Sequence, residues 1–547
     1  MSSDRSPAAT LNSAQLAAVH HLGSPCLVLA GAGSGKTRVI VHKIARLLDA
    51  GFAPEQIAAI TFTNKAAAEM RERARALVGG RAAAKLAVST FHALGVRILR
   101  MDGARLGLPE NFSIFDSDDV LGVLKDAGGT TDNAVARRWQ WAISAWKNRG
   151  LASAGAEAEV LAGTRDDRSG DDALVAARVM RRYEERLQAY RAADFDDLVV
   201  LPMRLLAEHD DVRDGWRDRL RYLLVDEYQD TNGVQYELMK LLAGARGAFT
   251  AVGDDDQSIY GWRGATIENL RRLPVDYPKL AVIPLEQNYR STGSILAAAN
   301  AVIGHNPKLF EKKLWSELGK GDPVVLVDCD DEAHEAERAV ARIESLRAAG
   351  AAFGDIAILY RANHQARAFE QALQKAGIPY KVSGGQSFFE RAEIRDLCAW
   401  LRLLVNEDDD PAFLRAATSP KRGIGHQTLA ALGGFAQRWK SSLFAALFAD
   451  SLADALPRRA IAGLHEFGRT IHSLQERARD ARGGADAKAM LLGWLDEIGY
   501  ESHLRDGEDS SALADARWAN VLDFVDWIAR RCGGTGSVAT GDEEEAT

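Results

Sequence analysis

The chain has 547 residues, of which 47% are hydrophobic and 26% are charged, and its formal net charge is −8 at pH 7. This length exceeds what a single hydrophobic core supports, so we expect several domains, and the acidic balance excludes binding of polyanions by overall charge but not by a local basic groove. The four cysteines lie far apart without a C-x-x-C pair, which argues against a zinc site and a disulfide framework.

Six short apolar runs, separated by helical stretches, predict parallel β-sheets. The first run, CLVLA (26–30), leads through a Gly-rich loop into a stretch whose apolar residues recur at helical spacing. The other runs cover residues 57–63, 221–227, 249–254, 280–286 and 355–361. This alternation predicts an α/β fold whose functional loops lie at the carboxyl ends of the strands. No apolar run of about 18 residues occurs, so we expect a cytoplasmic protein.

Two regions have a mainly helical pattern. Residues 86–196 contain no strand-like run, and we expect a helical insertion there. From residue 377 onwards the chain again becomes helical, with a loop-rich hinge expected at 383–385. The last segment, 536–547, combines small residues with a run of acids, which predicts disorder.

The segment AGAGSGKT (30–37) follows a predicted strand and opens a predicted helix, which is the context of a P-loop. Its backbone N–H groups would bind phosphates, Lys36 would reach the β- and γ-phosphates, and the Thr37 hydroxyl would ligate Mg²⁺. The strict pattern has Gly at the first position, where this chain has Ala30. On this motif alone, a Gly-rich turn before a helix remains the alternative.

The segment LLVDEYQD (223–230) is an apolar strand that ends in an acidic pair, as in a Walker B element. Asp226 would hold the Mg²⁺, and Glu227 would accept a proton from the attacking water. An acidic pair at a strand end is otherwise a solvated turn or a helix cap. The P-loop upstream favours the metal-binding interpretation.

The segment VGDDDQSIYGWRGA (252–265) places three carboxylates, Gln257, a tyrosine and Trp262 in one turn region. Its polar half suits a phosphate site, and its aromatic half suits a flat ligand. Taken alone, Trp262 is more typical of a core aromatic residue than of a ligand contact.

Eight motifs occur in order along the chain and together resemble those of superfamily 1A DNA helicases of the UvrD/Rep/PcrA type, with wording nearest to the Rep group. They are LNSAQ (11–15), AGAGSGKTR (30–38), ITFTNKAAAEMRER (60–73), STFHALGVRILR (89–100), DFDDL (194–198), LLVDEYQDTN (223–232), VGDDDQSIYGWRGA (252–265) and LEQNYRS (285–291). The resemblance runs from about residue 11 to at least residue 432 and implies RecA-like motor domains with large helical insertions. It implies a first motor domain, 1A, at 1–85 and 197–278, an insertion, 1B, at 86–196, the first part of a second motor domain, 2A, at 279–376, and an incomplete helical domain, 2B, at 377–535.

The resemblance also implies an ATP site. Gln15 would hydrogen-bond the adenine edge, and Arg38 and Tyr289 would hold the adenine ring between them. Arg290 would reach the γ-phosphate, and Gln257 would sense it. The expected nucleotide-binding residues are Gln15, Ala30, Gly31, Ala32, Gly33, Ser34, Gly35, Lys36, Thr37, Arg38, Tyr289 and Arg290, and the expected catalytic residues are Lys36, Glu227, Gln257 and Arg290.

By the same resemblance, several loops would contact single-stranded DNA. Tyr260 and Trp262 would do so, Trp262 by stacking on a base, which contributes about 1–3 kcal/mol per base regardless of sequence. The expected contacts in the motor domain are Phe62, Thr63, Asn64, Thr90, Phe91, His92, Tyr260, Trp262 and Arg263. For the ring of His92 alone, a structural role is the better interpretation.

Two later segments, GGQSFFERAEIRD (384–396) and SPKRGIGHQTLAAL (419–432), resemble parts of domain 2B. In the second, a Gly-Ile-Gly turn resembles a helix-hairpin-helix whose backbone amides bind duplex phosphates. Its expected DNA contacts are Lys421, Arg422, Gly423 and Gly425. A simple αα-hairpin remains the alternative.

The sequence departs from the family pattern after domain 2B. Neither a T-x-H-x-x-K-G-L-E segment nor a final motif ending in an arginine at the γ-phosphate occurs before Thr547. We therefore expect the second motor domain to be only half encoded. An arginine at the transferred phosphoryl group contributes about 10³–10⁵ in rate, so we expect ATP binding to survive but unwinding to be inefficient.

The sequence predicts an ATP-dependent 3′→5′ DNA helicase that uses ATP and Mg²⁺ in DNA replication or repair. Its expected partners are single-stranded DNA, DNA junctions and replication-fork proteins, with no membrane, as a monomer or a DNA-induced dimer. One alternative is the helicase part of a recombination helicase–nuclease, although no nuclease-like segment occurs. The other is an ATP-regulated DNA-binding protein without motor activity.

Overall fold

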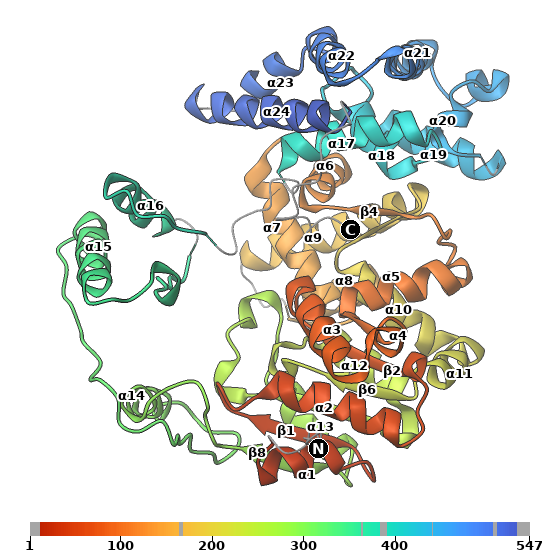
Figure 1. The fold of residues 1–547 in the computed structure, drawn as a ribbon. Coiled ribbons are helices and arrows are strands. Elements are labelled where there is room, and N and C mark those ends of the chain that lie inside the picture. Colours follow the sequence, from red (N-terminus) through yellow and green to blue (C-terminus); the bar gives the residue numbers. More distant parts are fainter. Residues whose placement is uncertain are drawn as a thin grey trace. The chain divides into compact units, whose positions relative to one another are not determined.

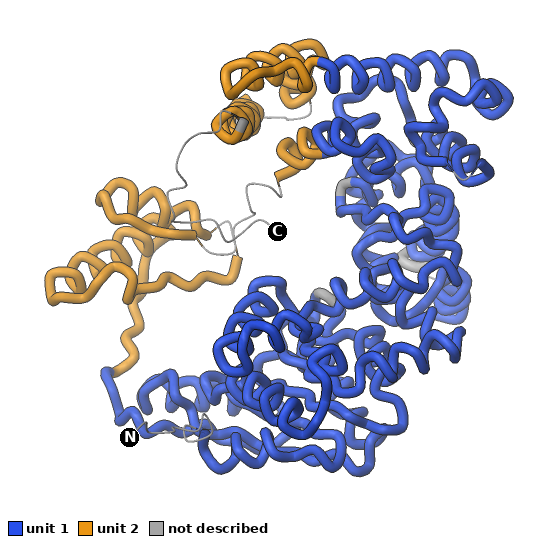
Figure 2. Tube along the Cα trace, turned by 45° about the vertical axis from the view of Figure 1, so that its right-hand side comes forward, with its two compact units in different colours: residues 1–322, 399–476 blue, residues 323–398, 477–547 orange. Residues whose placement is uncertain are grey.

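The chain forms two compact units in the computed structural model (Figure 2): residues 1–322 with 399–476, and residues 323–398 with 477–547. The structure describes residues 11–163, 168–362, 365–382, 391–439, 441–506 and 511–532. The expected hinge at 383–385 and the acidic tail lie outside these described residues. Within them, no helix is both long enough and apolar enough to cross a membrane.

The larger unit is built on a six-stranded sheet in the order β3-β2-β6-β7-β1-β8, in which all neighbouring strands are parallel. The strands are β1 (Cys26–Ala30), β2 (Ile57–Thr61), β3 (Ala87–Thr90), β6 (Tyr222–Val225), β7 (Phe249–Gly253) and β8 (Ala281–Leu285). Every residue of β1, β2, β6 and β7 is buried. A parallel sheet covered on both faces requires such continuous apolar strands, which is why they were readable as apolar runs.

Helices cover both faces of this sheet (Figure 1). Alternate residues of a strand point to opposite faces, so Leu27 and Leu29 join one core and Val28 joins the other. The first core contains side chains of α5 (Phe91–Asp102), α10 (Asp197–Glu208), α11 (Asp210–Arg219), α12 (Gly233–Ala243) and α13 (Glu268–Asp276). The second contains those of α1 (Ser13–His20), α2 (Lys36–Asp49) and α3 (Asn64–Val78).

The expectation that 86–196 contains no strand was wrong. Strand β3 joins the main sheet beside β2, and β4 (Ser113–Phe115) pairs with β5 (Ala192–Asp194) in a small parallel sheet. Only alternate residues of β3 are buried, and β4 and β5 have three residues each, so none of them forms a continuous apolar run. The rest of this region is helical, with α6 (Ser117–Gly128), α7 (Asn133–Lys147), α8 (Ser153–Gly163) and α9 (Arg168–Ala189).

Part of the late helical region packs on this insertion within the larger unit. Helix α18 (Asp410–Thr418) contacts β4, and α19 (His426–Trp439) contacts α9. Arg415 of α18 forms a half-buried ion pair of 2.6 Å with Asp116, just before α6. The Arg415–Asp116 pair joins residues that are 299 positions apart in the chain.

The apolar run 355–361 does not form the expected strand. In the smaller unit, α15 (Glu332–Ala348) and α16 (Ala366–Lys375) pack through a small core, but Leu326 and Leu359 are 89% and 93% exposed. A strand needs a partner for its backbone groups, and no strand is assigned in the described part of this unit. Across the described parts of both units, the remaining α-helices are α4 (Gly80–Ala83), α14 (Gly293–Ile303), α17 (Ala392–Val405), α20 (Leu443–Ala446), α21 (Arg458–Asp480), α22 (Gly484–Glu497), α23 (Tyr500–Asp506) and α24 (Ser511–Cys532).

Gly95 allows α5 to approach α10 closely, which yields a test of this packing. A Cβ at Gly95 would overlap the backbone oxygen of Leu198, so we expect Gly95→Ala to destabilise the protein by about 1–3 kcal/mol. Gly215 is an exposed residue of α11, and a Cβ added there would meet no neighbouring side chain within 4 Å, so Gly215→Ala should be neutral or stabilising by up to about 1 kcal/mol. Thermal unfolding of the two variants checks this, and equal melting temperatures would contradict the close approach.

Candidate functional site

The carboxyl ends of all six strands lie at one edge of the main sheet, because the strands are parallel. The segments that leave this edge carry the predicted site residues. They are the P-loop after β1, residues 62–64 after β2, residues 91 and 92 after β3, residues 226–230 after β6, residues 254–263 after β7 and residues 286–291 after β8.

The P-loop has the backbone conformation that its glycines permit. Gly33 and Gly35 have φ of +68° and +88°, a left-handed conformation that other residues rarely adopt. A Cβ at Gly33 would also lie only 2.6 Å from the side-chain nitrogen of Asn288. Ala30, which departs from the strict motif, is the fully buried last residue of β1, where an extended backbone needs no glycine.

Lys36 connects three of these segments. It is the first residue of α2, and its Nζ donates to Glu227 Oε2 at 3.1 Å and to Gln257 Oε1 at 3.2 Å. Gln229 Nε2 donates to the same Glu227 oxygen at 2.9 Å, and Gln229 Oε1 accepts the backbone N–H of Asp254. Gln229 was not predicted as a site residue, because its position within LLVDEYQD does not reveal its hydrogen bond to the turn after β7.

The acidic pair at the end of β6 has two different environments. Asp226 is 7% exposed, and burial, followed by the charge of Glu227, raises its pKa to about 7, although Lys36 opposes this shift. Glu227 has φ of +47°, which is uncommon for a non-glycine residue. Burial makes the negative charge of Asp226 unfavourable unless a cation is near. Its carboxylate and the Thr37 hydroxyl are the kind of hard oxygen ligands that Mg²⁺ prefers. The residues therefore fit this metal ion.

Hydrogen bonds hold α1, the P-loop and the segment after β8 together. Gln15 is 1% exposed, and its Nε2 donates to the backbone oxygen of Ser34 at 2.8 Å. Asn12 Nδ2 donates to the Tyr289 hydroxyl at 2.8 Å, and the Tyr289 N–H donates to the Gly33 oxygen. Asn12 was not predicted as a site residue, although the capping box that it forms with Gln15 at the start of α1 is visible in the sequence.

Asn288 is a second missed residue in this region. It is 2% exposed, its Nδ2 donates to the Ala32 oxygen at 2.6 Å, and its Oδ1 accepts the N–H groups of Arg290 and Ser291. One buried side chain thus holds the P-loop against the segment that carries Tyr289 and Arg290. A single asparagine within LEQNYRS gives no sequence signal for this contact.

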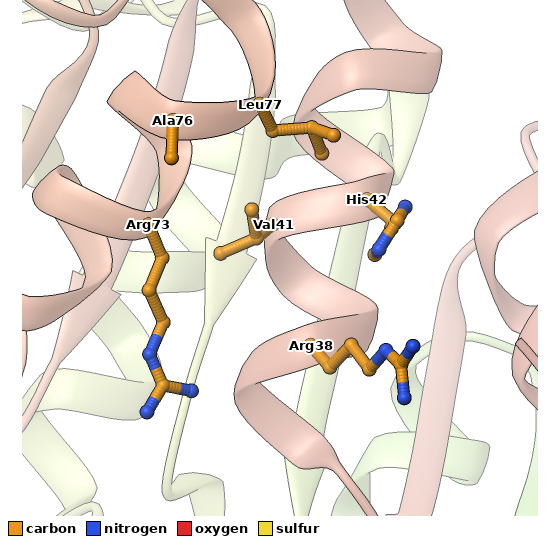
Figure 3. Close-up of a pocket in the computed structure, with 6 residues that line it drawn as sticks. All are labelled: Arg38, Val41, His42, Arg73, Ala76 and Leu77. Carbon is orange, nitrogen blue, oxygen red and sulfur yellow. The ribbon is translucent and has the colours of Figure 1, made fainter. Parts of the chain in front are cut away.

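Arg38 lies in a pocket of about 350 Å³ between α2 and α3. Figure 3 shows Arg38 on α2 and Arg73 on α3, with Val41, His42, Ala76 and Leu77 completing the mainly apolar lining. Burial, and then the charge of Arg38, lower the pKa of His42. The Tyr289 ring is 45% exposed, and no ring contact between Arg38 and Tyr289 occurs among the described residues.

Aromatic residues form a surface group at the same edge of the sheet. Phe62 and Tyr260 have ring centroids 5.0 Å apart, and those of Tyr260 and Trp262 are 6.3 Å apart. Trp262 is 65% exposed, so it is not a core residue. The His92 ring lies 4.7 Å from the ring of Phe195, which is 60% exposed and which the sequence analysis missed.

The residues around these rings differ in their roles. Thr63 and Thr90 cap α3 and α5 by accepting backbone N–H groups, and Asn64 is exposed. Phe91 is 4% exposed and belongs to the core, so its side chain cannot contact DNA as expected. Burial lowers the pKa of His92 to about 4, which makes the ring neutral at pH 7. The side chain of Arg263 lies outside the described part of the structure.

The turn between α18 and α19 carries the second predicted DNA contact. Lys421, Gly423 and Gly425 are exposed, and Gly423 has φ of +76°. Arg422 differs from the expectation, because its guanidinium lies 4.4 Å from the Trp400 ring centroid and donates to the Ala416 oxygen. Burial lowers the pKa of Arg422 to about 10, so this arginine packs against the protein and is not presented to a ligand.

Comparison with known proteins gives consistent matches along the chain. Residues 11–278 match the UvrD/REP helicase N-terminal domain, and residues 283–454 match the UvrD-like helicase C-terminal domain. The chain is 45% identical to the ATP-dependent DNA helicase Rep of Salmonella typhimurium over 95% of this chain and 76% of that protein. It is 45% identical to Rep of Escherichia coli, over 96% and 77% of the two chains, and 41% identical to the ATP-dependent DNA helicase PcrA of Leuconostoc citreum, over 94% and 68%.

We expect Asn288→Ala to weaken binding of a nucleotide to the P-loop. It removes three hydrogen bonds that hold the P-loop in place. If about 1.4–2.8 kcal/mol of the lost free energy falls on nucleotide binding, the affinity decreases about ten- to hundredfold. Titration with a fluorescent ATP analogue measures the dissociation constant. Asn306→Ala, at an exposed position, is the matched control and should leave it unchanged.

Proposed function

Because the chain belongs to the UvrD/Rep helicase family, we propose that it is a 3′→5′ translocase that acts on single-stranded DNA and fork-like junctions. At the coarser level it is an ATP-dependent DNA helicase of the Rep/UvrD type. One observation carries the finer proposal. Gln257, which Lys36 contacts at 3.2 Å, and the exposed Trp262 lie five residues apart after β7. A single turn can therefore join phosphate chemistry to base stacking.

We assign the nucleotide to the P-loop and the segments around it. The backbone amides of the loop and Lys36 would bind the phosphates, and Mg²⁺, held by Thr37 and Asp226, would neutralise part of their charge. Gln15 would bind the adenine edge, and Arg38 and Tyr289 its faces. Arg290 would contact the γ-phosphate, and this role is supported by the closeness of Arg290 to Gly33 of the P-loop.

We assign the general base to Glu227. In the structure the Lys36 ammonium lies within hydrogen-bond distance of both Glu227 and Gln257. A phosphate bound by Lys36 would compete with Glu227 for this ammonium and leave the carboxylate available to accept a proton from water. Gln229 would keep the carboxylate oriented while this happens, since it donates to the same oxygen.

We assign single-stranded DNA to the exposed aromatic group. Stacking on Trp262, Tyr260 and Phe62 would hold bases without regard to sequence, and Phe195 with the neutral His92 would add a second stacking surface. Thr63 and Asn64, at the start of α3, would contact the backbone. At a junction, the turn of Lys421, Gly423 and Gly425 would bind duplex phosphates, without Arg422. Action in the cytoplasm and the division into domains 1A, 1B, 2A and 2B remain predictions.

A second candidate is ATP-regulated DNA binding without sustained unwinding by residues 1–547 alone. It is favoured by the exposed apolar residues at 324–327 and 359, since the described part of the smaller unit contains no strand that would complete a second motor domain. Comparing ATP hydrolysis with and without single-stranded DNA, and then unwinding of a forked duplex, separates the two candidates. DNA-stimulated hydrolysis with no unwinding would support the second.

Glu227→Gln should keep ATP affinity within about threefold and lower the rate of hydrolysis by about 10²–10⁴-fold. It removes the proton acceptor, but the glutamine side chain has nearly the same shape and its amide oxygen still accepts a hydrogen bond. Binding and single-turnover hydrolysis of ATP measure the two effects. Glu268→Gln, at an exposed position on α13, is the control and should have neither effect. Unchanged hydrolysis by Glu227→Gln would assign the base to another group.

Trp262→Ala should weaken single-strand binding by about 1–3 kcal/mol, nearly equally for oligonucleotides of different composition. Fluorescence anisotropy of labelled oligonucleotides measures this. Trp439→Ala removes another exposed tryptophan, 62% exposed at the end of α19, and should leave single-strand affinity unchanged. A loss confined to one base composition would instead indicate sequence reading.

A further inference from the structure

Three consecutive carboxylates, Asp254, Asp255 and Asp256, follow β7 and have oxygen atoms within 4.8 Å of one another. Asp254 and Asp255 are buried, with 2% and 8% of their surface exposed. Carboxylates this close repel each other, and burial makes their charges more costly. This turn therefore needs a compensating positive charge to hold one conformation.

Lys312 supplies that charge from a segment more than 50 residues away. Its side chain is 5% exposed, and its Nζ contacts all three carboxylates, including Asp256 at 3.1 Å. Desolvation alone would lower the pKa of Lys312, but hydrogen bonds and charge from Asp254 and Asp255 raise it above its ordinary value. The ammonium thus occupies the centre of the acidic cluster and stays charged.

Asp254 connects Lys312 to the residues around Lys36. Its Oδ2 accepts a hydrogen bond from Gln257 Nε2, and its Oδ1 accepts the Asp256 N–H at 3.2 Å. Gln257 Oε1 in turn accepts from Lys36 Nζ. With its amide nitrogen bonded to Asp254, Gln257 has its oxygen directed at Lys36. The orientation of this amide is therefore fixed by the carboxylate that Lys312 holds.

The segment that carries Lys312 is itself attached to the nucleotide-binding loops. Glu286 accepts the backbone N–H of Lys313 through Oε1 and that of Trp315 through its main-chain oxygen, and the Asn288 N–H donates to the Trp315 oxygen. A Cβ at Gly31 would overlap the side chain of Leu314. Residues 312–315 thus contact both the P-loop and the turn after β7.

We propose that Lys312 is a positioning residue for ATP hydrolysis, which holds Asp254 so that Gln257 is directed at Lys36 and the γ-phosphate. This inference rests on the proposed function, because it assigns Gln257 to the reaction. It adds a route by which movement of the segment after β8 changes the orientation of Gln257. Lys312 acts through Asp254 and does not itself contact the nucleotide.

The test is single-turnover ATP hydrolysis by residues 1–547, together with binding of a fluorescent ATP analogue. Lys312→Met should lower the hydrolysis rate about ten- to hundredfold, as expected for a displaced reacting group, and should change nucleotide affinity by less than about threefold. Lys313→Met removes the neighbouring lysine, whose side chain is exposed, and should leave both quantities unchanged.

Two further comparisons separate positioning from simple stabilisation. Asp254→Asn should reproduce the loss in rate, whereas Asp256→Asn, which removes a Lys312 contact but none to the Gln257 side chain, should have a much smaller effect. In a Gln257→Ala background, Lys312→Met should cause no additional loss. Equal effects of the two aspartate variants, or additive losses in the double variant, would overturn the inference. If Lys312→Met does not fold, the comparison of Asp254→Asn with Asp256→Asn tests the inference.

The same data distinguish the inference from the proposed function. If Gln257→Ala hydrolyses ATP as fast as the unmodified protein, the role of Gln257 in the proposed function fails, and the inference fails with it. If Gln257→Ala is impaired while Lys312→Met and Asp254→Asn are not, only the inference about Lys312 fails.

Discussion

The parallel arrangement of the six strands is the constraint on which the rest of this structure depends. In a parallel sheet every strand ends at the same edge, so segments separated by up to about 260 residues leave the sheet side by side. The P-loop, the acidic pair, the turn after β7 and the segment of Tyr289 meet for this reason. Continuous apolar strands and helices on both faces supply the stability of the sheet, and the edge is left free for polar residues.

At this edge the Lys36 ammonium is shared between a carboxylate and an amide. Glu227 and Gln257 both accept from it, and Gln229 and Asp254 then fix the orientation of these two acceptors. An anion that takes the place of one of these acceptors would release Glu227 or Gln257 from Lys36. Gln257 and the exposed Trp262 are five residues apart, so the proposed coupling between them needs no long path.

The sequence predicted the parts of the molecule that depend on local pattern. Buried parallel strands are continuous apolar runs, and the P-loop glycines are required by backbone conformation, so both were readable. Strand β3 was missed because only one face of it is buried, and the run 355–361 was overpredicted because an apolar run forms a strand only beside a partner. The β-propensity of the residues in a run does not indicate whether a neighbouring strand is present to pair with it.

The site residues likewise divide into those set by local sequence motifs and those that depend on distant partners. Lys36, Glu227 and Gln257 came from motifs and do meet, whereas Asn288 and Gln229 had no local signal because their roles are long-range hydrogen bonds. Arg422 illustrates the opposite error. A guanidinium in a turn beside glycines suggested phosphate binding, but a tryptophan 22 residues earlier in the chain offered it a ring face. Arginine stacks on aromatic rings as readily as it binds phosphate, and only the fold decides between these partners.

The negative charges of the two acidic groups at this edge are balanced in different ways, and this difference supports different proposed roles for the two groups. The cluster of Asp254, Asp255 and Asp256 looks more like a cation site by its number of carboxylates, yet Lys312 already occupies its centre. Asp226 has the backbone N–H of Glu227 as a partner, and no basic side chain is bonded to it among the described residues, so burial and the charge of Glu227 raise its pKa to about 7. A divalent cation gains more by binding where the negative charge is uncompensated than where it must displace an ammonium. This contrast supports the proposals that Asp226 is the metal ligand at this edge and that the three-carboxylate turn orients Gln257.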